Sequence, residues 1–285
     1  VAIMPLPVII TRPAAQAEHW RMALLQRLND CRVCHTLPLI AIEPVTDPLL
    51  QLRLKRCWQE LSQFYAAVFV SPVAAESFFS AIPAATATWQ KKGLRAWAVG
   101  PGTRHALLQT GVAPECIDSP DDCAAQFESE ALWPLVQPQL AHCLRSGKKI
   151  LRVRGTDRPA TFIPSDIAAE SLASGTGRDW LGAAIRHAGV GLESVAAYRR
   201  QLPAWNGEQT RMAHSLVGTP AVWLFSSSLA LRNLAVLLPG APWASAVALA
   251  THPRIAGLAH RLGFRQVVTC RPTLDDVVQS LQSCP

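Results

Sequence analysis

Hydroxyl-bearing residues recur at one kind of position in this sequence, the point where a short apolar run gives way to an amphipathic stretch. Such a run followed by such a stretch predicts a strand that leads into a helix. A hydroxyl beside the free backbone N–H groups of a helix start can bind an anionic group, and the same hydroxyl can simply cap the helix. Capping is the commoner role for any single residue, but the two roles can coexist. The residues at these turns are Thr11, Ser71, Thr103, Ser226, Ser227 and Thr251.

Short motifs of several common enzyme classes are missing. The sequence has no GxSxG and no HExxH, and the GPG at residues 100–102 lacks the third glycine of a dinucleotide-binding fingerprint. The eight cysteines are too sparse for a disulfide scaffold. The CxxC of Cys31 and Cys34 lies in a strand-like segment, so buried reduced thiols are a better interpretation than a redox or metal site. We therefore expect neither a cofactor nor a metal ion.

Six strand-to-helix units place the hydroxyl residues. In chain order they read VIITRP, VFVSP and WAVGPGT, then ILRVRG, VWLFSSS and ALATHP. They form two triplets with similar separations along the chain, which indicates an ancient duplication. We therefore expect two similar parallel-sheet α/β domains with a cleft between them.

Length, composition and charge agree with this expectation. A chain of 285 residues with 49% hydrophobic residues can form two moderate domains, each with its own core. The net charge of +7 is scattered, which argues against a nucleic-acid partner but suits a small polyanion. The apolar N-terminal run lacks a preceding basic residue, and residues 221–250 contain prolines and polar residues. We expect no signal peptide, no membrane span and a cytoplasmic location.

The ordered motifs resemble those of the uroporphyrinogen-III synthase family. The resemblance rests on a first strand ending in TRP, a strand ending in Ser before a helix, VGPGT, a strand with RG, a lone tyrosine in AAYRR, and FSSS. It covers nearly the whole chain and implies that one of the two domains is discontinuous. The implied domains are residues 1–37 with 203–285, and residues 46–192, joined by a two-stranded linker of residues 38–45 and 193–202.

The segment after Gly155 departs from the family pattern. The family runs from RG almost directly into Gly-Arg-Asp-x-Leu, which begins here at Gly177, after the additional residues 156–176. A surface loop can absorb such an insertion at little thermodynamic cost. The insertion leaves open which of Arg154 and Arg178 lies beside the ligand.

The resemblance implies an enzyme that closes hydroxymethylbilane, a linear tetrapyrrole with eight carboxylates, into uroporphyrinogen III. Ring D is inverted through a spiro intermediate, and water is lost. Because the bilane closes without inversion when no enzyme is present, the protein must mainly hold its substrate in a productive shape. Tyr198, one of two tyrosines, falls at the family's tyrosine position and is the candidate general acid. The alternative is a ring packed at a domain edge with its hydroxyl in water.

The resemblance also implies that the hydroxyl residues and several arginines bind the substrate's carboxylates, although most arginines in proteins are solvated surface residues. The candidate arginines are Arg12, Arg154, Arg178 and Arg254. A monomer is implied, and a transient contact with hydroxymethylbilane synthase is left open. A non-catalytic tetrapyrrole-binding or sensory module on the same bilobal fold is the alternative, since a fold does not fix a function.

Overall fold

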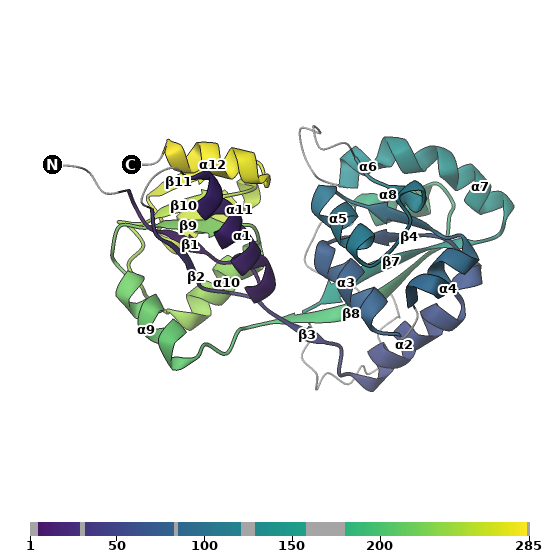
Figure 1. Ribbon diagram of the computed structural model, residues 1–285, viewed down its shortest axis with the longest axis horizontal. Coiled ribbons are helices and arrows are strands. Elements are labelled where there is room, and N and C mark those ends of the chain that lie inside the picture. Colours follow the sequence, from purple (N-terminus) through teal and green to yellow (C-terminus); the bar gives the residue numbers. More distant parts are fainter. Residues whose placement is uncertain (1–4, 29–31, 83–84, 121–128, 158–179, 284–285) are drawn as a thin grey trace. The chain divides into compact units, whose positions relative to one another are not determined.

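The computed structural model describes residues 5–28, 32–82, 85–120, 129–157 and 180–283. The chain divides into two compact units, Val1–Ile42 with Gln201–Pro285 (unit 1) and Glu43–Arg200 (unit 2). The beginning of the chain thus belongs to the same unit as its last third, which Figure 1 shows by the purple and yellow segments of unit 1. The bounds expected above for the two domains and their linker stay predictions.

Unit 1 is built on a parallel sheet that, within the described residues, has five strands in the order β11-β10-β9-β1-β2. All neighbouring strands in it pair in parallel, so their carboxyl ends meet at one edge. Buried strands without polar alternation, such as VII and VWLF, are typical of such sheets. The strands are β1 (Val8–Ile10), β2 (Cys34–Thr36), β9 (Val222–Phe225), β10 (Val247–Ala250) and β11 (Gln266–Thr269).

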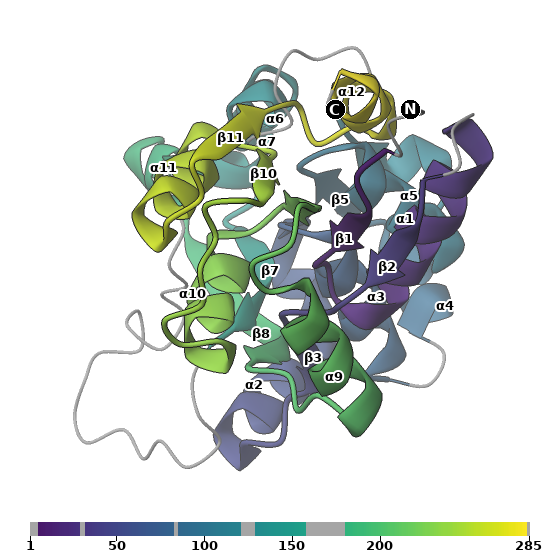
Figure 2. The same ribbon diagram turned by 90° about the vertical axis from the view of Figure 1, so that its left-hand side faces the viewer.

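Helices cover both faces of this sheet (Figure 2). Ile9 faces a core shared with α9 (Gly207–Leu216), α10 (Ser228–Leu237) and α11 (Pro253–Leu262). Its neighbours Val8 and Ile10 face the opposite core, shared with α1 (Ala14–Arg27) and α12 (Leu274–Gln282). This alternation follows from the period of two in a β-strand, so a three-residue strand supplies both cores.

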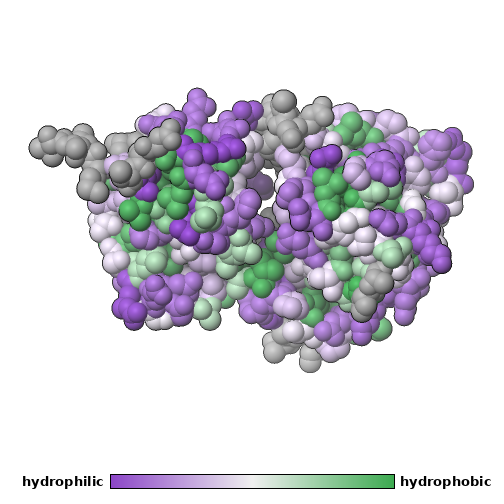
Figure 3. All heavy atoms as spheres, viewed as in Figure 1, coloured by the Kyte–Doolittle hydropathy of each residue, from purple (hydrophilic) through white to green (hydrophobic). Residues whose placement is uncertain are grey.

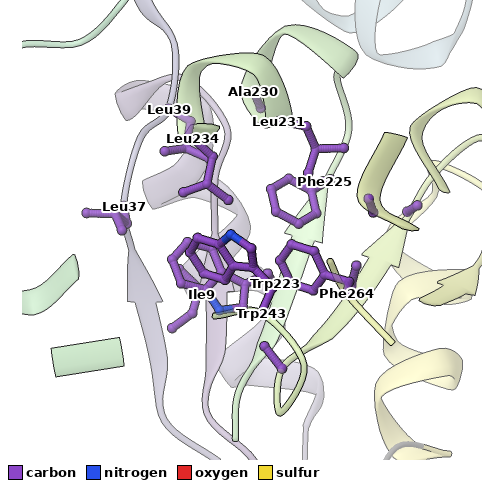
Figure 4. Packing of buried hydrophobic residues seen from close by; sticks show 14 of the residues in the cluster. Ile9, Leu37, Leu39, Trp223, Phe225, Ala230, Leu231, Leu234, Trp243 and Phe264 are labelled. Carbon is purple, nitrogen blue, oxygen red and sulfur yellow. The ribbon is translucent and has the colours of Figure 1, made fainter. Parts of the chain in front are cut away.

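Aromatic rings form the centre of the first of these cores (Figure 4). Trp243 and Phe264 are stacked with ring centroids 5.2 Å apart, and Trp223 meets Trp243 edge-on at 5.2 Å. Aromatic pairs of this kind contribute roughly 0.5–1.5 kcal/mol beyond the burial of their area. Trp223 and Phe225 anchor β9 in this core, and the serines follow β9 directly.

Unit 2 contains a second sheet, with six strands among the described residues in the order β3-β8-β7-β4-β5-β6. From β8 through to β6, neighbouring strands all pair in parallel. The carboxyl ends of these five strands therefore also share one edge. The strands of the sheet are β3 (Ala41–Pro44), β4 (Phe64–Phe69), β5 (Arg95–Ala98), β6 (Ile117–Asp118), β7 (Lys149–Thr156) and β8 (Leu192–Gln201).

The two faces of this sheet carry different cores. Aliphatic residues of α6 (Ser129–Val136), α7 (Leu140–Arg145) and α8 (Trp180–His187) pack on one face. On the other, rings of α2 (Pro48–Gln59), α3 (Pro72–Ser80) and α4 (Ala85–Lys92) pack around Phe69 of β4. Helix α5 (Pro101–Gln109) lies beside α3.

The sheets do not follow the two triplets read along the chain. Strand β1 belongs to the first triplet, but it pairs with β9. Strand β9 pairs in turn with β10, and both β9 and β10 belong to the second triplet. The strands β4 and β5 of the first triplet join β7 of the second. Each sheet therefore contains the strands of three of the six strand-to-helix segments, and neighbouring strands in a sheet can be far apart in the sequence.

On the view in Figure 3, hydrophilic residues cover much of both units and hydrophobic residues form smaller groups. In the part of the chain that the structure describes, no helix combines the length and apolar character needed to cross a membrane.

Candidate functional site

The carboxyl edge of the unit 2 sheet brings Ser71 and Tyr198 together. Ser71 follows β4 and Tyr198 lies in β8, and their side-chain oxygens are 3.1 Å apart. Ser71 is also the N-cap of α3, where its Oγ accepts the backbone N–H of Ala74 at 3.1 Å. Capping, one of the two roles expected for the hydroxyl residues, is thus observed for Ser71, and Pro72 stands in the first turn of the helix. Tyr198 is almost completely buried, at 4% exposure, so its phenol is a fixed group and not a mobile surface ring.

The first turns of α3 and α5 lie next to each other at this edge. A Cβ at Gly102 would be in ordinary contact, 3.5 Å from Cγ of Pro72. The N-cap of α5 is Gly100, which has no side chain to accept a hydrogen bond from the helix. Since uncapped N–H groups and the helix dipole favour an anion, the start of α5 suits a carboxylate. The predicted residue Thr103 lies in this first turn and is buried.

Arginines flank the same edge. Arg200 donates to Asp157 at 2.7 Å, and Arg199 donates to Glu43 at 2.7 Å. These ion pairs hold the carboxyl end of β8 against its neighbours. Arg154 lies in β7 and is partly buried. Arg178 lies outside the described residues, so the choice between the two arginines stays open.

In unit 1, predicted residues follow three adjacent strands at the carboxyl edge. Thr11 follows β1, Ser226 follows β9 and Thr251 follows β10. The Thr11 hydroxyl is buried and donates to the carbonyl of Leu224 at 2.7 Å, which ties β1 to β9. The backbone N–H of Thr251 donates to the Phe225 carbonyl at 3.0 Å. The side chains of Ser226 and Thr251 are partly exposed.

The remaining predicted residues of unit 1 lie at helix starts. Ser227 caps α10 by accepting the N–H of Leu229 at 3.2 Å. His252 caps α11, since its Nδ1 accepts the backbone N–H of Arg254 at 3.0 Å, while the Arg254 side chain is exposed. Helix α1 starts after Pro13 without a side-chain cap, so its N-terminus, like that of α5, leaves N–H groups without a capping side chain.

Arg12 precedes this uncapped helix. Its guanidinium lies 4.0 Å from the ring centroid of Trp20, a cation–π contact with α1. Its Nε is buried without a hydrogen-bond partner. Burial lowers the pKa of Arg12 to about 10, and Cys270 opposes this effect. A buried cation with an unpaired donor is costly unless an anion pairs with it.

Among the described residues, no group of three His, Cys, Asp or Glu side chains lies close enough together to hold a metal ion. Trp20, which contacts Arg12, and Gly155, which pairs with Tyr198 of β8, are candidate site residues that the sequence did not reveal. The glycine inside the strand segment ILRVRG is the signal that could have revealed Gly155, because such glycines often mark a close approach of another group.

Two compact units, each with a largely parallel sheet, helices on both faces, and hydroxyl groups and helix starts at the carboxyl edge, define a two-domain α/β protein. The model of the family described as uroporphyrinogen-III synthase HemD matches residues 32–279. This match covers most of the chain, and the chain belongs to the uroporphyrinogen-III synthase family, whose enzymes act in heme biosynthesis.

Two solved structures are similar to this chain over nearly its whole length. The uroporphyrinogen-III synthetase from Helicobacter pylori is 13% identical, with a TM-score of 0.56 over 98% of this chain and 99% of that chain. A mutant uroporphyrinogen III synthase from the extremely thermophilic bacterium Thermus thermophilus is 15% identical, with a TM-score of 0.46 over 97% and 98% of the two chains. At this identity the Helicobacter likeness concerns the two-domain fold. A search of curated proteins found no match.

Proposed function

We propose that this chain is a lyase that closes hydroxymethylbilane into uroporphyrinogen III with inversion of ring D. Loss of the terminal hydroxyl from ring A gives an azafulvene, and ring D attacks it through its substituted carbon. The resulting spiro intermediate fragments and recombines with ring D inverted. The proton that leaves with the hydroxyl as water is balanced by the proton lost when the last pyrrole becomes aromatic again.

The observation that carries this proposal is the buried phenol of Tyr198, 3.1 Å from Ser71 at a sheet edge that can accept an anion. Tyr198 is the residue that donates a proton to the departing hydroxyl. Ser71 fixes the phenol oxygen through its own hydroxyl, which is held in turn by the α3 backbone. General acid catalysis by a positioned group contributes roughly 10²–10⁴-fold, and orientation of the bilane supplies the rest.

Carboxylate groups of the substrate bind at the helix starts and beside arginines. The uncapped N-termini of α1 and α5 supply backbone donors, and Arg12 supplies a buried charge that an anion would neutralise. Backbone N–H groups bind any carboxylate without a particular side chain, which fits a site with few distinctive motifs. The proposed binding residues are Thr11, Arg12, Ser71, Thr103, Arg154, Arg178, Ser226, Ser227, Thr251 and Arg254.

The proposed enzyme works as a cytoplasmic monomer, without a cofactor, and receives its substrate from hydroxymethylbilane synthase by free diffusion or transient contact. The test supplies bilane made freshly by that synthase, oxidises the product and separates the type I and type III uroporphyrins by chromatography. A tetrapyrrole-binding or sensory module would leave the type I product of uncatalysed closure unchanged, whereas a synthase would replace it with type III.

A further inference from the structure

Gly155 lies directly against the ring of Tyr198. Strands β7 and β8 are parallel neighbours, and their register pairs Gly155 with Tyr198. A Cβ at position 155 would lie 2.5 Å from Cζ of the ring, 2.6 Å from Cε2 and 2.9 Å from the phenol oxygen. Two carbon atoms without a bond between them do not approach so closely. The ring therefore occupies the volume that any other side chain at 155 would need.

A β-bulge produces this contact. Arg154 pairs with Ala196 and Gly155 pairs with Tyr198, so Ala197 is an extra residue in β8. A bulge of this kind redirects the side chains that follow it. With unbroken register Gly155 would pair with Ala197, and the tyrosine ring would lie beside the next residue of β7. The bulge and the glycine together put the ring over the β7 backbone.

The phenol end of the same ring meets Ser71, which stands on the other side of β7 in the strand order β8-β7-β4. The ring thus crosses over β7 at Gly155 to reach a hydroxyl that follows β4. A side chain on residue 155 would lift the ring off the strand and break this alignment. Gly155 is buried and Tyr198 is 4% exposed, so the ring is enclosed by protein where it crosses the strand.

We propose that Gly155 is a positioning residue of the reaction, acting through Tyr198 by leaving the space that the ring needs to reach Ser71. This inference rests on the proposed role of Tyr198 as proton donor. Displacement of a reacting group by about 1 Å can cost on the order of 10²-fold in rate. Because Gly155 acts through the phenol, its effect on the reaction rate cannot exceed the effect of the phenol itself.

The Gly155→Ala variant is compared with Gly191→Ala, which changes a glycine at the other end of the same strand pair. At position 191 a Cβ would meet the flexible Lys149 side chain at 3.1 Å from Cγ, so this control should fold and act normally. Gly155→Ala should lower kcat by about tenfold or more while KM stays within about twofold, since the phenol acts in the transition state.

A double-mutant cycle separates positioning from general damage. In a Tyr198→Ala background, Gly155→Ala should cause less than about a twofold further loss, because the group it positions is gone. The same loss in both backgrounds, or a Gly155→Ala variant with normal kcat, would overturn the proposal.

A readout without substrate keeps the test independent of the proposed reaction. In a Tyr65→Phe background Tyr198 is the sole tyrosine, so tyrosine labelled with ¹³C at Cζ alone gives one ring signal by NMR. That signal should shift with Gly155→Ala and stay in place with Gly191→Ala; an unmoved signal contradicts the inference. Wild-type protein that forms only the type I isomer would instead refute the proposed function, and the ring signal would still decide whether Gly155 fixes the ring.

Discussion

The Ser71 hydroxyl links helix α3 to the phenol of Tyr198. Its oxygen lies 3.1 Å from the Tyr198 hydroxyl and accepts the Ala74 N–H at the same distance. A serine hydroxyl has one proton and two acceptor positions, so it can keep both contacts whichever way the phenol proton points. A single residue therefore serves as a helix cap and as the fixed neighbour of the proposed acid.

Removal of the phenol should slow the reaction moderately. Tyr198→Phe should lower kcat by about 10²-fold, the lower end of the range for loss of one general acid, and should leave KM near its original value. Steady-state assays on freshly made hydroxymethylbilane give both constants. Tyr65→Phe removes the phenol hydroxyl of the other tyrosine, which lies in β4, and should leave kcat unchanged. Equal losses of kcat in the two variants would refute a specific role for Tyr198.

Ser71→Ala should combine a loss of stability with a loss of rate. Loss of an N-cap hydroxyl costs about 1 kcal/mol, and the phenol also loses its partner. Thr273→Ala is the matched control, because Thr273 caps α12 by accepting the Asp276 N–H at 3.2 Å. Both variants should unfold earlier in urea, but Ser71→Ala alone should lower kcat. A normal kcat for Ser71→Ala would mean that the hydroxyl serves only the helix.

Replacement of Arg12 by methionine should stabilise the protein without ligand and weaken substrate binding. Burial depresses the pKa of Arg12 to about 10, so folding disfavours its charged form. This penalty is fully present below about pH 10 and fades as the pH rises toward the ordinary pKa of the side chain.

At neutral pH the Arg12→Met variant should therefore have a higher thermal unfolding midpoint. The midpoint should rise by about 2–4 °C for each 1 kcal/mol gained in the free energy of unfolding. Its KM should rise, because the carboxylate that pairs with Arg12 loses its partner. Thermal unfolding at pH 7 and KM measurements check the two effects. A lower midpoint together with an unchanged KM would indicate that Arg12 serves only to pack on Trp20.

Substrate binding at the unit 1 edge should shield Cys270. This partly exposed thiol follows β11 and interacts electrostatically with Arg12. Cys116 is also partly exposed but precedes β6, at the opposite edge of the unit 2 sheet. With uroporphyrinogen III under anaerobic conditions, alkylation by N-ethylmaleimide should slow severalfold at Cys270 and stay unchanged at Cys116.

Peptide mass spectrometry resolves the alkylated thiols, and Cys57 is an internal reference. Burial raises the pKa of Cys57 to about 12, and only thiolates react, so Cys57 should stay unlabelled in the folded protein at pH 8. Equal protection of Cys116 and Cys270 would show a general effect of the ligand and would argue against binding at the unit 1 edge.

Strand-to-helix turns could be located from the sequence because their signals are local. Ser71 followed by Pro72 is a pair of adjacent residues typical of a helix N-cap and first turn, and Ser71 is the N-cap of α3 in the structure. At α5 and α11 the local signal was less exact, since Gly100 and His252 are the N-caps and not Thr103 and Thr251.

Other features depend on pairing between distant segments and could not be predicted. The meeting of Gly155 with Tyr198 requires the register of β7 and β8 and the extra residue Ala197. The contact of Arg12 with Trp20 depends on how α1 turns back over the sheet. Alternation of apolar residues cannot specify either feature, because both are set by tertiary packing.

The isomer ratio of the product tests the central claim most directly. Purified protein is added to hydroxymethylbilane while it forms, and the type I and type III uroporphyrins are separated after oxidation. We expect type III to predominate with the wild-type chain and type I to predominate in its absence. A product that stays at the type I level of the reaction without protein, from a folded chain, would contradict the assignment as a synthase.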